Sequence, residues 1–69
     1  MRKDEINKLK KADFKRGFTF LAMNDLVGNA SFDAGLYTLQ VPGYFQNSWK
    51  GKIHRSKISD IKTQLLELV

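Results

Sequence analysis

Apolar residues recur at helical spacing near both ends of the chain. Ile6 and Leu9, continued by Ala12 or Asp13, predict a short helix over residues 3–12. Near the C-terminus, Ile61, Leu65 and Leu68 have the same spacing, joined by Leu66. Ser59 is the expected N-cap of this second helix, with Asp60 in its first turn.

Residues 17–28 combine two patterns. The run from Phe18 to Met23 suits a buried strand. A helix is suited by Leu21, Ala22, Asp25 and Leu26, with Gly28 as a stop. A strand is favoured, and the helix stays open as the alternative.

A hairpin is the clearest local signal. Ser31-Phe32 precedes Asp33-Ala34-Gly35, and residues 36–41 follow, which indicates two strands joined by a three-residue loop ending in glycine. Val41-Pro42-Gly43-Tyr44 then fits a type II turn.

One further short strand, or a strand and a loop, is expected from Tyr44, Phe45, Trp49 and Ile53, with Gly51 allowing a bend or bulge. The pattern as a whole predicts a single α+β domain over residues 1–69. It consists of an N-terminal helix, an antiparallel sheet of about three strands and a C-terminal helix.

Chain length limits the stability of this domain. A chain of 69 residues buries only about 60% of the surface that its unfolded form exposes. It has no cysteine for disulfides and a single histidine, too few for a structural zinc site, so we expect no metal and no cofactor. Homodimer formation is one expected source of additional stability.

The net charge of +5 is concentrated in two segments. Residues 1–16 hold seven Lys/Arg and three acids, residues 17–49 hold two acids and no cation, and residues 50–57 hold four cations and no acid. The N-terminus shows no secretory pattern, and the apolar stretch within residues 17–27 is too short to span a bilayer, so a cytoplasmic protein without membrane contact is expected.

No catalytic constellation is visible. A Cys–His nucleophile is excluded by composition, and a serine triad would have to use His54, which lies among Lys52, Arg55 and Lys57. The aspartates stand at a helix start or beside turn residues, and the glycines match neither phosphate-binding pattern. We therefore expect a protein that is not an enzyme.

The segment of residues 44–57 carries the positive functional signal. It mixes aromatic, amide, hydroxyl and cationic side chains. Together these can stack on a nucleic-acid base, hydrogen-bond to the edge of the base and neutralise backbone phosphate. Cations of the first helix extend this footprint if that helix lies alongside. The candidate binding residues are Lys50, Lys52, His54, Arg55, Lys57, Trp49, Lys8, Lys11, Lys15 and Arg16. The alternative without a binding function is that the aromatics are core residues and that the cations form a solvated face.

The expected order of helix, three strands and helix resembles that of double-stranded-RNA-binding domains and of the small HicA-type mRNA-cleaving toxins. For the toxins it rests on Phe32-Asp33-Ala34-Gly35, Leu39-Gln40-Val41-Pro42 and a following helix. The histidine that the toxins place on a strand before the hairpin has no counterpart between Phe18 and Phe32, and the helix at Ser59 lacks the lysine run of the RNA-binding domains. The resemblance is one of topology; it favours RNA or DNA as a partner and assigns no family.

Two functions follow as hypotheses. The first is a small, non-enzymatic regulator that binds nucleic acid through its Lys/Arg clusters and neighbouring aromatics. The alternative is a protein-binding inhibitor or accessory factor, of the kind that phages and other mobile elements encode. It would dock on an acidic protein partner with Tyr37, Tyr44, Phe45 or Trp49 as anchors.

Overall fold

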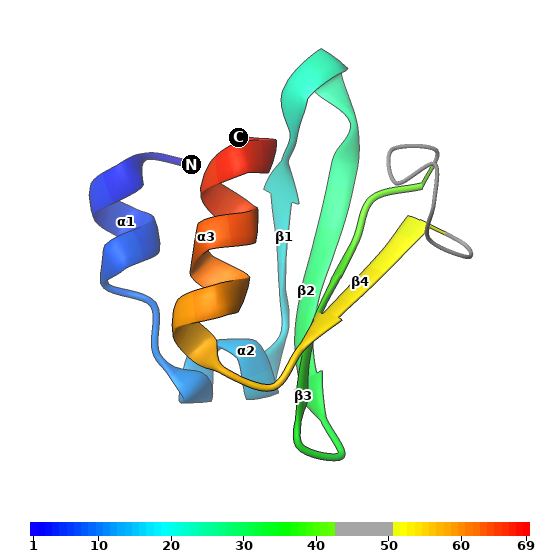
Figure 1. The fold of residues 1–69 in the computed structure, drawn as a ribbon. Helices are drawn as coiled ribbons and strands as arrows, with labels where there is room; N and C mark the ends of the chain where they lie inside the picture. Colours follow the sequence, from blue (N-terminus) through cyan, green and yellow to red (C-terminus); the bar gives the residue numbers. More distant parts are fainter. Residues whose placement is uncertain (43–50) are drawn as a thin grey trace.

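The computed structural model describes residues 1–42 and 51–69. In chain order its elements are α1 (Lys3–Asn7), α2 (Lys11–Arg16), β1 (Phe18–Leu21), the 3-10 turn η1 (Met23–Asp25), β2 (Val27–Asp33), β3 (Leu36–Gln40), β4 (Lys52–Arg55) and α3 (Ile58–Leu68). The predicted α+β class is confirmed, with helices at both ends of the chain and an antiparallel sheet between them (Figure 1).

The sheet has four strands rather than about three, in the order β1-β2-β3-β4. The strand favoured for residues 17–28 forms over Phe18–Leu21, and η1 then reverses the chain. Asn24 and Asp25 make this reversal with positive φ of 62° and 58°, values that Asn and Asp tolerate better than most residues. The helical alternative for this stretch is wrong apart from that single turn.

One face of the sheet is covered by the helices. The register places Phe18 beside Ala30, Ala30 beside Leu39 and Leu39 beside Ile53, so these side chains share a face. Against this face the helices bury their apolar positions, and the core contains Ile6, Phe14, Phe20, Ala22, Ala30, Tyr37, Leu39, Val41, Ile61, Leu65 and Leu68.

The hairpin is confirmed, with a shorter loop than expected. Asp33 pairs with Leu36, so the loop contains only Ala34 and Gly35. Both have positive φ, 51° and 78°, as a type I′ turn requires. This turn matches the twist of the two strands, which explains why two residues suffice.

The single N-terminal helix predicted over residues 3–12 is two helices. α1 ends at Asn7, Lys10 is extended with φ −120° and ψ 165°, and α2 begins at the next residue. This break lets Ile6 and Phe14, both fully buried, reach the core from separately oriented helices. Ala12, placed on the apolar face by its spacing, is exposed.

The C-terminal helix begins two residues earlier than expected. Its N-cap is Lys57, without a side-chain cap, and Ser59 lies inside the first turn, where its carbonyl accepts a bond from the Thr63 hydroxyl (3.0 Å). Gly51 has φ +67°, in line with the expected bend. Gly43 and Tyr44 of the expected type II turn, and the strand residues Tyr44 to Trp49, lie outside the described residues.

Gly28 provides a test of the packing between β1, β2 and the end of β3. A Cβ at this position would lie 2.5 Å from a ring carbon of Phe20 and 2.9 Å from a methyl carbon of Val41. We expect Gly28→Ala to lower the free energy of unfolding by about 1–3 kcal/mol, measured by urea denaturation, because the core would have to expand.

The matched control is Ser31→Ala on the same strand, an exposed position that should change stability by less than about 0.5 kcal/mol. A Gly28→Ala protein as stable as the wild type would contradict the described packing.

Candidate nucleic-acid interface

Positive charge is concentrated at the end of the molecule that lies opposite the two termini. This end contains α2, the β2–β3 turn and the connection from β4 to α3 (Figure 1). Its cations are Lys10, Lys11, Lys15, Arg16, Arg55 and Lys57, which we call the basic end. Three acids, Asp13, Asp33 and Asp60, stand on the same segments.

The opposite end has the reverse balance. It contains the start of α1, the η1 turn and the end of α3, next to the termini (Figure 1). These segments carry two cations, Arg2 and Lys3, and four acids, Asp4, Glu5, Asp25 and Glu67. The described segments therefore form a positive end and a slightly negative end.

A chain of ring contacts connects the two basic segments of the sequence. The Lys11 ammonium lies 4.8 Å from the centre of the Phe32 ring. The Phe32 and Tyr37 rings are 4.5 Å apart, and Tyr37 is paired across the sheet with Arg55. The first helical region and β4, about 40 residues apart in the sequence, thus meet at one end of the molecule.

Strand alternation divides the second basic segment. Arg55 lies on the helix-covered face, whereas Lys52 and His54 occupy alternate positions on strand β4. Lys52 is therefore on the face that no described element covers, and so is His54. The sequence suggested one continuous footprint for these residues, and the structure separates them between two faces.

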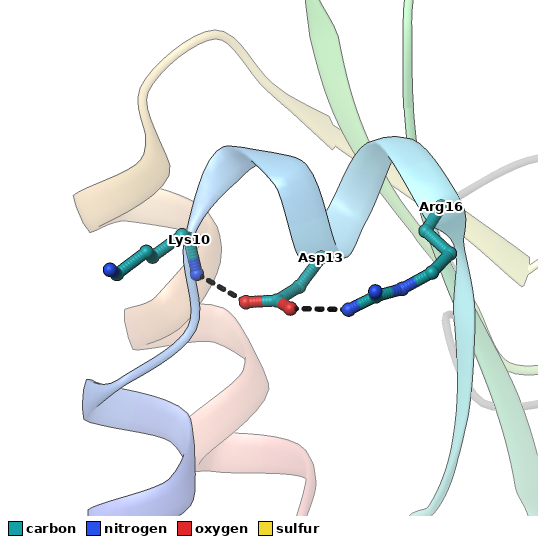
Figure 2. Close-up of polar contacts among 3 residues, drawn as sticks. All are labelled: Lys10, Asp13 and Arg16. Carbon is teal, nitrogen blue, oxygen red and sulfur yellow. Dashed lines mark hydrogen bonds and ion pairs between the residues drawn. The ribbon is translucent and has the colours of Figure 1, made fainter.

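Asp13 organises the basic end locally (Figure 2). Its carboxylate accepts one bond from the backbone N–H of Lys10 and another from the guanidinium of Arg16, each 2.8 Å long. The first bond caps the start of α2, and the second is an exposed ion pair between residues three apart. Arg16 is therefore less available to an external anion than its neighbours.

Most other cations have no partner within the described part of the chain. The side chains of Lys8, Lys10, Lys15, Lys52 and Lys57 make neither an ion pair nor a hydrogen bond to any described residue. Lys62 differs, because its ammonium donates to the carbonyl of Asn7 (3.0 Å) and ties α3 to α1. Arg55 donates to the carbonyl of its neighbour His54 (2.7 Å).

His54 is exposed and belongs to a polar row on the uncovered face. Its Nδ1 lies 2.7 Å from the Thr38 hydroxyl, and Thr38 is paired with Ser31 on the next strand. A parallel row contains Thr19, Asn29, Gln40 and Lys52. Sequence reasoning missed these rows, although the alternation of polar and apolar residues over 27–33 was a usable signal.

The aromatic residues that the structure describes serve the core. Tyr37 is only 5% exposed, and its ring meets that of Phe14 edge-on at 5.1 Å. Tyr37 is therefore a core residue, which contradicts its expected role as an anchor for a protein partner. Trp49 and Lys50, with Tyr44 and Phe45, lie outside the described residues.

Residues 1–42 and 51–69 give no evidence for a metal site or a membrane-spanning helix. These ranges contain no group of three or more His, Asp or Glu side chains that could hold a metal ion. No helix in them is long and apolar enough to cross a membrane. The chain matches no protein family model, and comparison with curated proteins and with solved structures gave no match either.

The role of Asp13 can be tested by two substitutions. We expect Asp13→Ala to lower the free energy of unfolding by about 0.5–2 kcal/mol, because it removes the cap on α2. Asp13→Asn retains an oxygen acceptor for the Lys10 N–H, so its free energy of unfolding should fall clearly less. Thermal denaturation followed by circular dichroism measures both.

Arg16→Gln serves as the control, since it removes the ion pair and leaves the cap, and we expect a change below about 1 kcal/mol. If Asp13→Ala and Arg16→Gln lowered the free energy of unfolding equally, the ion pair and not the cap would account for the stabilisation by Asp13.

Proposed function

We propose that this protein is a small, non-enzymatic regulator that binds nucleic acid, and that the basic end contacts the phosphate backbone. The observation that carries the proposal is the charge distribution over the described segments: six cations against three acids at this end, and two cations against four acids at the other. Because unpaired cations release condensed counterions from nucleic acid on binding, such a surface favours phosphate contact.

The availability of the cations supports this function. Lys10, Lys15 and Lys57 are exposed and have no partner among the described residues, so binding phosphate would break no existing bond of theirs. Their contacts would position the protein on a backbone without reading sequence. The polar rows on the uncovered face, which end at Lys52 and His54, offer hydrogen-bonding groups for a second set of contacts.

An acidic protein partner is the alternative explanation of the charge. Protein interfaces usually bury apolar or aromatic anchors at their centre. At the basic end, the only large apolar side chain that is exposed among the described residues is Leu36; the others, Met1, Leu21, Met23 and Val27, stand elsewhere. The described surface therefore favours a phosphate backbone over a protein.

The test compares two double variants with the same change in charge. Lys10 and Lys57 are both N-cap residues without a side-chain cap bond, so K10Q/K57Q should leave the fold intact. We expect it to weaken binding to labelled duplex DNA, single-stranded DNA or RNA, measured by fluorescence anisotropy over a range of salt concentrations. The slope of log K against log salt should fall by about 1.4–1.8, the value for two lost phosphate contacts.

The control R2Q/K3Q removes two charges at the opposite end and should change the slope by less than about half as much. If both variants weaken binding equally, net charge rather than the basic end accounts for the affinity. Absence of salt-dependent binding to all three nucleic acids would contradict the proposal and leave the acidic protein partner to be tested.

A further inference from the structure

The two edges of the sheet differ in how they are protected. β4 carries Lys52, His54 and Arg55, and cations on an edge strand discourage pairing with another chain. β1, with the sequence Phe-Thr-Phe-Leu, carries no charge, and no described residue hydrogen-bonds to its outer edge. The outer edge of β1 is therefore open to pairing with another strand.

The backbone bonds near β1 show which groups face outward. The N–H of Ala22 donates to the carbonyl of Leu26 (2.7 Å), which lies on the β2 side. Because backbone groups alternate along a strand, Phe18 and Phe20 also direct their N–H and C=O toward β2. Those of Thr19 and Leu21 consequently point away from the sheet.

Exposed apolar side chains accompany these free groups. Leu21 is 53% exposed and Val27, its partner on β2, is 61% exposed on the same face. Met23, in the turn that joins the two strands, is 44% exposed. The end of β1 thus combines unpaired backbone groups with apolar surface, the two elements of a strand-addition site.

We propose that the outer edge of β1 pairs antiparallel with β1 of a second copy, giving a two-fold symmetric dimer with one continuous sheet. The fitting register sets Phe20 opposite Phe20 of the other copy, so that Thr19 and Leu21 face each other and exchange backbone bonds. A shift that sets Phe20 opposite Phe18 of the other copy would need the N–H of Gly17, which already donates to the carbonyls of Asp13 and Phe14.

The charges that flank β1 explain why the occupant is a second copy. Lys15 precedes the strand, at the end of α2, and Asp25 follows it in the η1 turn. Antiparallel pairing brings Lys15 of each copy toward Asp25 of the other, so a strand that is itself neutral gains two complementary contacts. Pairing through β4 would instead place cations against cations.

The size of the contact sets the expected affinity. A four-residue strand pair buries less than the roughly 1,200 Å² of stable complexes, so the dimer should be weak and reversible. We expect sedimentation velocity to show the mean mass rising from one chain toward two as concentration increases from about 10 μM to about 1 mM.

Two variants with the same chemical change locate the contact. Leu21→Lys puts a cation on the β1 edge and should weaken the dimer by on the order of tenfold or more. Leu36→Lys, a partly exposed leucine on the same sheet face beside the hairpin turn, should leave it unchanged. Lys15→Glu should also weaken the dimer, and K15E/D25N should restore part of the loss.

Amide hydrogen exchange tests independently whether the outer edge of β1 forms the dimer contact. Protection of the Thr19 and Leu21 amides should increase with protein concentration, whereas that of Phe18 and Phe20 should not. A protein that stays monomeric at about 1 mM would overturn the proposal. So would a dimer that Leu21→Lys leaves intact, or one whose concentration-dependent protection appears on β4.

Discussion

Ile6, Phe14, Ile61 and Leu65 are fully buried against one face of the sheet, and the rest of the structure depends on this contact. A chain of 69 residues has only enough apolar side chains for one such layer. The helices therefore gather on a single side, and the described elements leave the second face uncovered. Both the polar rows on that face and the open edge of β1 result from this constraint.

The same contact explains the distribution of charge. To bury Phe14 as well as Ile6, the N-terminal region breaks into two helices, and α2 then lies at the end where the β2–β3 turn and the β4–α3 connection meet. Cations from both ends of the sequence are brought to that place. The amphipathic packing of short elements thus creates a charged end from the described helices and strand ends.

Binding and self-association would use different parts of this molecule except for Lys15, which belongs to the basic end and also flanks β1. The phosphate contacts are assigned to the ends of helices and strands, whereas the proposed dimer uses the neutral edge strand. In an antiparallel pair the two basic ends would lie at opposite extremes of the joined sheet, because α2 precedes β1 in each copy. Two distant cationic surfaces would then be available to one polymeric partner, which raises avidity when both engage.

The sequence by itself determined the elements whose signals are local. The hairpin followed from Asp33-Ala34-Gly35, and the final helix followed from the spacing of Ile61, Leu65 and Leu68. Both depend on turn conformation or periodicity within a few residues. The choice of strand for Phe18–Leu21 was also correct, but its pairing with β2 depends on contacts beyond that segment.

Only the tertiary structure decided how the candidate residues are grouped. Tyr37 belongs to the core because Phe14 packs against it, and Arg55 is separated from His54 because successive residues of a strand face opposite sides. The meeting of Lys11 with Phe32 joins segments that no local pattern relates. Composition fixes how much charge the chain carries, whereas packing across the sheet fixes where that charge lies.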